Sequence, residues 1–159
     1  MTTKSDFTEE EWTRVRRAPL VAGMAISLAD PGGPIELAKE TTASLKSATN
    51  PPSREQLLAD IALDLQAMAQ QRQNPLTEFK PTKESDPRQQ ILEELRAVTE
   101  IVSSKATTEE TAAFKQWLLT TSQAAADAAK EGGFMGFGAE QVSQGEKDML
   151  SQVRATIGA

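Results

Sequence analysis

The sequence predicts an all-α protein, a single-domain bundle of about six to seven helices that spans residues 1–159. Three observations predict this fold. Apolar residues recur at intervals of three and four along most of the chain, helix-capping signals open several of these segments, and alternating strand-like runs are nearly absent. A chain of this length can bury one core without a disulfide or a structural metal.

The first two helices are expected to meet at Pro19. Thr8 and Glu11 form a capping box, which opens a helix because each side chain satisfies the other residue's backbone amide. Pro19 should break or kink this helix, since proline removes one hydrogen bond from a helix interior. A second helix is predicted from Pro19 to about Ala29, and it is central because nearly every side of it is apolar.

A third helix follows the turn predicted at residues 30–33. Pro34 suits a first helical position, and Asn50-Pro51-Pro52 is a stop signal, so the helix should extend to about Lys46. Its expected buried residues are Ile35, Leu37, Ala38 and Leu45.

The clearest helical stripe begins after Ser53, which forms a predicted capping box with Gln56. This helix should last to about Gln73, and its stripe consists of Leu57, Leu58, Ile61, Leu65 and Met68. Residues 74–85 contain two prolines and no apolar period, which predicts a crossover loop and a hinge, held in place by Phe79.

Two more helices are predicted on either side of a turn near Lys105. Asp86-Pro87 should begin the first, with a stripe of Ile91, Leu92, Leu95, Val98 and Val102. Thr107 and Glu110 should cap the second, whose buried face is Phe114, Trp117, Leu118, Thr121, Ala125 and Ala128. Ser143 and Glu146 should cap the last helix, which carries Met149, Leu150, Val153 and Ile157.

Composition argues against several function classes. The chain has no His and no Cys, so it lacks the most common general base, every thiolate nucleophile and the usual zinc and haem ligands. We therefore expect no enzyme and no cofactor. Its net charge of −6 has the wrong sign for wrapping nucleic acid.

One segment imitates a secretory signal, because Arg14, Arg16 and Arg17 precede an apolar run from Leu20 to Ala29. Acidic residues come before the arginines, and the run is shorter than the roughly 20 apolar residues of a membrane span. The expected location is cytoplasmic, with no transmembrane segment.

The Gly/Phe-rich loop at residues 131–142 is the first candidate binding site. If Phe134, Met135 and Phe137 point outward, they form an apolar patch that docks a partner or a membrane surface. Trp117 is a further candidate binding residue, with a role as a core anchor as its favoured alternative. The favoured alternative is that these side chains plug the core while the glycines permit the bends. The loop lacks the Lys and Ser/Thr of a phosphate-binding loop.

Asp60 and Asp64 are the second candidate, as oxygen ligands for calcium or magnesium. They lie four residues apart at the edge of an apolar stripe. The favoured alternative is that both pair with Arg or Lys or face water.

The segment Lys115 to Leu150, together with W-x-x-V-x-x-A-P and A-D-P-G-G near the start, resembles a group of uncharacterised bacterial proteins. These proteins share an EGGF-x-GFG-x-x-x-VS-x-x-E segment after an alanine-rich helix. The resemblance covers about half of the chain, and it implies a small helical cytosolic protein without implying an activity. A looser similarity is to TerB-like helical domains, although the acidic cluster of their metal site is not evident here.

These observations predict a protein that acts by binding a protein partner or a small apolar ligand. The alternative is a TerB-like regulatory domain that binds a divalent cation through carboxylates. A homodimer is the default assembly, because two-fold dimers are the most common.

Overall fold

The structure is a computed structural model that describes residues 1–29, 34–76, 79, 81–82, 84–130 and 144–159. These ranges contain six α-helices, a short 3-10 helix and no strand, which confirms the all-α bundle. The elements are η1 (Lys4–Asp6), α1 (Glu9–Ala29), α2 (Pro34–Ala48), α3 (Gln56–Gln70), α4 (Pro87–Lys105), α5 (Thr108–Lys130) and α6 (Gln144–Ile157).

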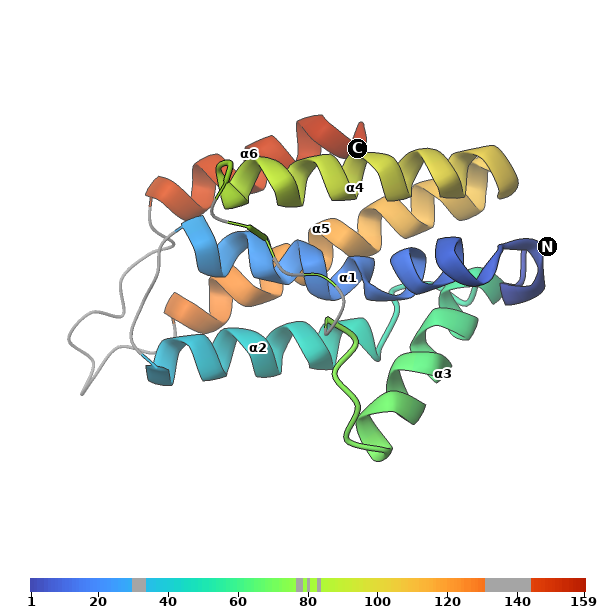
Figure 1. Cartoon of the computed structure of the whole chain (residues 1–159), viewed down its shortest axis with the longest axis horizontal. Helices are drawn as coiled ribbons and strands as arrows, with labels where there is room; N and C mark the ends of the chain where they lie inside the picture. Colours follow the sequence, from blue (N-terminus) through green and yellow to red (C-terminus); the bar gives the residue numbers. More distant parts are fainter. Residues whose placement is uncertain (30–33, 77–78, 80, 83, 131–143) are drawn as a thin grey trace.

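Helix α1 is the centre of the bundle (Figure 1). It contacts each of the other five described helices, with α4 and α6 on one side, α2 on the other and α5 crossing it. Helix α3 lies at a steep angle to the others at one end, close to the N-terminal segment and η1. This arrangement leaves the first turns of α1 between η1 and α3.

Pro19 does not end a helix, so the prediction of two helices meeting there is wrong. Helix α1 is continuous from Glu9 to Ala29, with Pro19 inside it. Proline deprives the Val15 carbonyl of its usual donor. Both flanking turns are nevertheless fully packed, since Val15, Ala18 and Val21 are buried. We infer that burial on every side outweighs the loss of one hydrogen bond.

The predicted buried face of α2 is also wrong. Leu37 is 52% exposed, Leu45 is 36% exposed and Ala38 is exposed, whereas the side chain of Ile35 lies outside the described part. Among residues 37–48 of this helix, whose side chains are described, the buried ones are Glu40, Ser44 and Ala48. Helix α2 therefore presents small and polar side chains to the bundle and leucines to solvent.

A close approach of α1 and α2 explains this orientation. A Cβ atom built on Gly23 would lie 2.1 Å from the Ser44 Oγ and 2.7 Å from its Cβ, so a larger side chain has no room at this crossing. Polar side chains near this crossing are hydrogen-bonded to one another. The hydroxyl groups of Ser47 and Thr121 are 2.9 Å apart, and the Ser27 hydroxyl donates to the Glu40 carboxylate. The leucines of α2 cannot turn towards α1 without separating the helices.

Two of the predicted capping boxes are confirmed. Thr8 and Glu11 exchange hydrogen bonds of 2.9 and 3.1 Å, and Thr107 and Glu110 do the same at 3.3 and 3.1 Å. Asp86 caps α4 as predicted, through its acceptance of the Arg88 amide at 3.0 Å. The Ser143 cap of α6 lies outside the described residues.

Both ends of α3 differ from the prediction. Its N-cap is Glu55 without a side-chain hydrogen bond, and Ser53 instead accepts the Glu55 amide at 3.4 Å, so the predicted box does not form. The helix ends at Gln70 because Arg72 adopts a left-handed conformation with φ 57°, which lets the Gln73 amide close the end at 2.8 Å.

The remaining stripes pack as predicted. Most of the stripe residues of α3, α4, α5 and α6 are buried in one shared cluster with α1. Leu150 is partly buried against this cluster, and Met68 and Ala128 are also only partly buried. Phe79 packs against the same core, and the Arg17 guanidinium lies over its ring at 5.1 Å, so Phe79 itself is anchored as predicted. The crossover loop and hinge predicted over residues 74–85 lie partly outside the described residues and stay a prediction.

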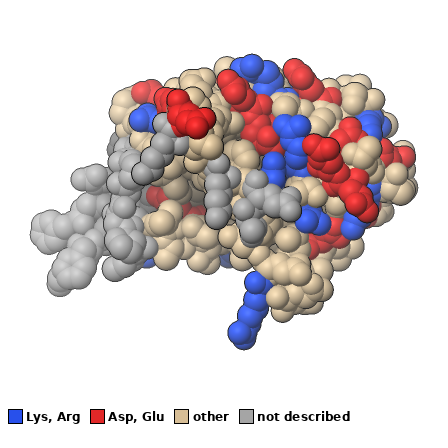
Figure 2. Space-filling view, viewed as in Figure 1, with Lys and Arg blue, Asp and Glu red and all other residues tan. Residues whose placement is uncertain are grey.

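Charged side chains are unevenly distributed over the face shown in Figure 2. Acidic and basic side chains are interspersed over the upper part of this face, whereas the lower edge, where α2 and α3 lie, carries few of them. None of the described helices has the length and apolar character that crossing a membrane requires.

Candidate functional site

The residues predicted around the Gly/Phe-rich loop are only partly visible. Phe134, Met135 and Phe137 lie outside the described residues. Trp117 is fully buried, and its indole Nε1–H donates to the Ser47 carbonyl at 2.8 Å. Its position is that of a core anchor, and the docking surface at this loop stays a prediction.

Asp60 and Asp64 lie on one face of α3, directed at the N-terminal segment. Asp60 accepts the Lys4 backbone amide at 3.1 Å and the Gln56 side-chain amide at 2.6 Å. Asp64 accepts the Trp12 indole N–H at 2.6 Å and the Lys4 ammonium at 3.0 Å. These carboxylates thus attach α3 to η1 and α1.

The environment of Asp64 favours its ionised form. Burial alone would raise the pKa of this carboxyl, but hydrogen bonds from Trp12 and Lys4, with the charges of Lys4 and Arg16, outweigh burial and lower the pKa. Within the described residues, no group of three or more acidic, His or Cys side chains is placed to hold a metal ion. Both aspartates are engaged by N–H donors instead.

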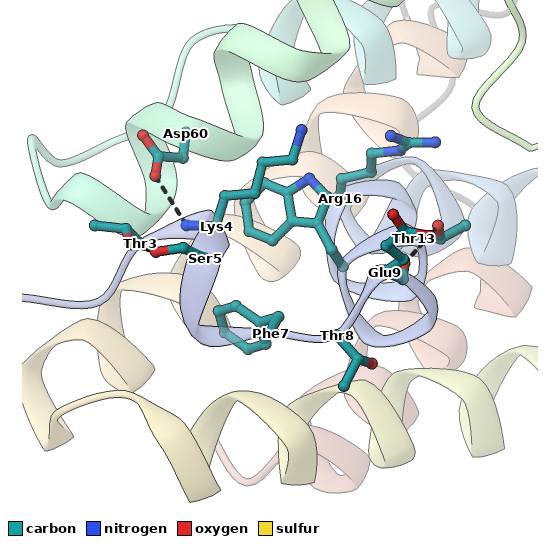
Figure 3. A pocket seen from close by; sticks show the side chains of 10 residues that line it. Thr3, Lys4, Ser5, Phe7, Thr8, Glu9, Thr13, Arg16 and Asp60 are labelled. Carbon is teal, nitrogen blue, oxygen red and sulfur yellow. Dashed lines mark hydrogen bonds between the residues drawn. The ribbon is translucent and has the colours of Figure 1, made fainter.

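Beside these aspartates is a groove of about 730 Å³ between η1, α1 and α3 (Figure 3). Small-molecule sites in proteins occupy roughly 300–1,000 Å³, so this groove has a suitable size. Hydroxyl groups of Thr3, Ser5, Thr8 and Thr13 line it together with Phe7, Trp12, Lys4, Arg16, Glu9 and Asp60.

The aromatic part of the groove follows from the local sequence at the start of α1. Phe7 directly precedes the N-cap Thr8, and Trp12 lies at the fourth helical position, the two places that form a hydrophobic staple. Their ring centroids are 5.7 Å apart at 45°. Lys4 extends over the indole, with its Nζ 5.9 Å from the ring. Trp12 is only 3% exposed, so its ring lies at the base of the groove and is partly covered by the Lys4 side chain.

Arg16 lies one turn beyond Trp12 and lines the same groove. Its Nη1 is 3.8 Å from the Asp64 carboxylate, which is too long for a hydrogen bond, and its buried Nε has no acceptor. The neighbouring Arg14 and Arg17 differ in that both donate to Glu94 at 2.9–3.2 Å, and the buried Nε of Arg17, like that of Arg16, has no acceptor. Within the described part of the chain, Arg16 is therefore a cation with incomplete hydrogen bonding.

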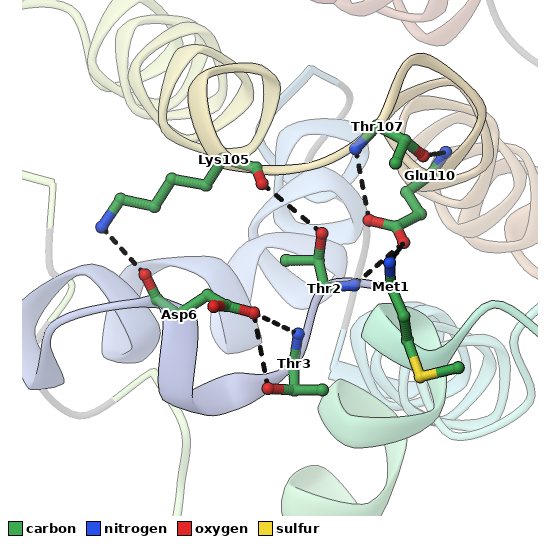
Figure 4. A network of polar contacts seen from close by, with 7 residues as sticks. All are labelled: Met1, Thr2, Thr3, Asp6, Lys105, Thr107 and Glu110. Carbon is green, nitrogen blue, oxygen red and sulfur yellow. Dashed lines mark hydrogen bonds and ion pairs between the residues drawn. The ribbon is translucent and has the colours of Figure 1, made fainter.

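A polar network fixes the wall of the groove that η1 forms (Figure 4). The Thr2 amide donates to Glu110 at 2.9 Å, and Lys105 donates to the Asp6 carbonyl at 3.1 Å, so the N-terminal segment is attached to the α4–α5 turn. Burial would raise the pKa of Glu110, but the hydrogen bonds from Thr2 and Thr107 outweigh it and lower the pKa.

Comparison of the chain with models of protein families, with curated proteins and with solved structures finds no match. The resemblances drawn from sequence motifs accordingly stay predictions.

Sequence reasoning found Asp60 and Asp64 but missed the groove that they border. The aromatic pair at Phe7 and Trp12 could have been found, because its spacing around the Thr8 cap is local. The role of Lys4 could not have been found, because its partners on α3 are distant in sequence. Asp60 lies 56 positions after Lys4, and Asp64 lies 60 positions after it.

Proposed function

We propose that the protein is a binding protein without catalytic activity that holds a small molecule of mixed polarity in the groove between η1, α1 and α3. The observation that carries this proposal is a groove of about 730 Å³ that combines a hydrophobic staple with the incompletely bonded Arg16. Ligand sites typically join an apolar lining to a few polar groups that orient the ligand.

The lining favours a ligand with an apolar body and a polar end. Phe7 and Trp12 lie at one side of the groove with 8% and 3% of their surface exposed. Thr3, Ser5 and Thr13 also line it, and their hydroxyl groups are hydrogen-bonded to one another or to the Glu9 carbonyl. Lys4 has a flexible side chain that is 57% exposed, so it can leave the indole when a ligand enters. The absence of His and Cys from the sequence is the reason to propose binding without turnover.

The two tryptophans provide a built-in test. Phenylethanol should be titrated into isotope-labelled protein while proton–nitrogen NMR spectra record both indole N–H signals, assigned with Trp12→Phe. A ligand in the groove should shift the Trp12 signal saturably and leave the Trp117 signal in place, because Trp117 is buried against Ser47. Equal shifts of both signals, or of neither, would contradict the proposal.

A variant that fills the groove supplies the second arm. Thr13 lines the groove, so Thr13→Phe should weaken the titration, whereas Thr42→Phe on the exposed side of α2 should not. Unchanged binding in Thr13→Phe would place the ligand elsewhere.

A further inference from the structure

We infer that the ligand of this groove carries a single carboxylate next to its apolar body, and that Arg16 is the residue that selects it. This inference rests on the proposed function, since it names the class of molecule that the same groove takes.

The first step is that the acidic groups of the groove already have hydrogen-bond partners, whereas Arg16 has none at hydrogen-bonding distance among the described residues. Asp60 and Asp64 already accept hydrogen bonds from Lys4, Gln56 and Trp12. Arg16 lines the groove and has the Asp64 carboxylate only at 3.8 Å from its Nη1, while its Nε has no acceptor but is inaccessible to solvent, so the Nη groups are the donors that a ligand could reach. A guanidinium has five N–H donors in a planar fork, and a carboxylate matches that fork with two oxygens. The unmet hydrogen-bonding capacity thus belongs to the cation.

The second step concerns the charge that the groove tolerates. Lys4 and Arg16 are its cations, and Glu9 and Asp60 line it with them, while Asp64 borders it. These carboxylates would repel a doubly charged phosphate more strongly than a singly charged carboxylate. The positive charges of Lys4 and Arg16 disfavour a cationic ligand end beside Arg16, so a single negative charge is the ligand charge that we infer.

The third step is position. Trp12 and Arg16 are four residues apart, which places both on one face of α1, and both line the groove. A ligand whose ring lies on the Phe7 and Trp12 staple can therefore extend its carboxylate along α1 towards the guanidinium. An aryl or alkyl carboxylic acid has this combination of groups.

Three probes with one phenyl body separate this inference from the proposed function: phenylacetate, phenylethanol and phenylethylamine. Each is titrated while the Trp12 indole N–H signal is followed. Phenylacetate should bind at least about tenfold more tightly than phenylethanol, as expected for one charge-assisted hydrogen-bonded pair. The amine should bind most weakly.

Variants then assign the preference to Arg16. Arg16→Gln should reduce phenylacetate binding to the level of phenylethanol and leave phenylethanol binding unchanged. Arg88→Gln removes the same charge from an exposed site at the start of α4 and should change neither. Glu9 is exposed and lines the groove, so Glu9→Gln removes a negative charge near the ligand and should strengthen phenylacetate binding. This second variant tests the inference even if Arg16→Gln does not fold.

The outcomes are distinct. Equal affinity for phenylacetate and phenylethanol, with a shifted Trp12 signal, would overturn the carboxylate inference and leave the proposed function standing. A carboxylate preference that survives in Arg16→Gln would overturn the role of Arg16. A Trp12 signal that no probe shifts would remove both proposals.

Discussion

Gly23 shows how one residue sets the distance between two helices. It is buried on α1, and an added Cβ would meet Ser44 of α2 at 2.1 Å. Replacing glycine with alanine in a helix ordinarily stabilises it by up to about 1 kcal/mol. We expect Gly23→Ala to do the opposite and to lower the free energy of unfolding by about 2 kcal/mol, because overpacking forces α1 and α2 apart. Urea denaturation measures this change.

A double-mutant cycle tests the cause. Ser44→Gly removes both clashing atoms and leaves Thr121 at 3.7 Å, an ordinary contact distance. In the Ser44→Gly background, Gly23→Ala should therefore leave the free energy of unfolding unchanged. The interaction free energy between the two substitutions should be about 2 kcal/mol. Gly145→Ala, on the exposed side of α6, serves as the control and should not destabilise the protein. Independent effects of the two substitutions would show that the crossing adapts.

Glu94 is a second single residue on which the contact between two helices, α1 and α4, depends. It accepts hydrogen bonds from Arg14 and from the buried Arg17, thereby joining α4 to α1. Glu94→Gln should lower the free energy of unfolding by about 3 kcal/mol, because it leaves a buried arginine without a counter-charge. Glu93→Gln removes the same charge from an exposed neighbour and should change stability by less than about 0.5 kcal/mol in the same urea denaturation. Similar losses in both variants would indicate a general charge effect.

At the scale of the element, α2 provides a direct test of which face is buried. Leu37→Gln should change the free energy of unfolding by less than about 0.5 kcal/mol, because Leu37 is 52% exposed. Leu63→Gln on α3 should also change the free energy of unfolding by less than about 0.5 kcal/mol, since Leu63 is 61% exposed. Leu58→Ala is the buried comparison and should cost about 2–5 kcal/mol. A large loss in Leu37→Gln would mean that its leucine face packs inward in solution.

Helix existence could be predicted wherever the determining chemistry is local. The capping boxes at Thr8 and Thr107 and the stripe from Ile91 to Val102 need only neighbours within a few residues. Pro19 and the face of α2 could not be predicted, because packing between different helices decides both. The groove is intermediate: its lining from Thr3 to Arg16 is local, and Asp60 of α3 is the lining residue that comes from a distant part of the sequence.

The whole molecule responds to pH through its carboxylates. The chain has no His, so no side chain has an ordinary pKa between pH 6 and 8. Hydrogen bonds from Lys105 and Thr8 lower the pKa of Glu11. For Glu94, burial alone would raise the pKa, but Arg14 and Arg17 outweigh it and lower the pKa. With Asp64 and Glu110, four carboxyls therefore release their protons more readily in the folded protein than in the unfolded chain.

The sign of the pH dependence follows from these directions. A carboxyl whose pKa is lower in the folded state stabilises the fold fully above its unfolded pKa, and this stabilisation is lost as pH falls through the folded pKa. We expect the free energy of unfolding to be constant from pH 6 to 8 and to fall below about pH 4.5. Urea denaturation at a series of pH values measures the curve. Glu94→Gln should have a shallower acid slope than the charge-matched variant Glu93→Gln, because it removes a carboxyl whose pKa Arg14 and Arg17 lower in the folded protein. A transition between pH 6 and 8, or equal acid slopes, would show that other groups couple folding to protons.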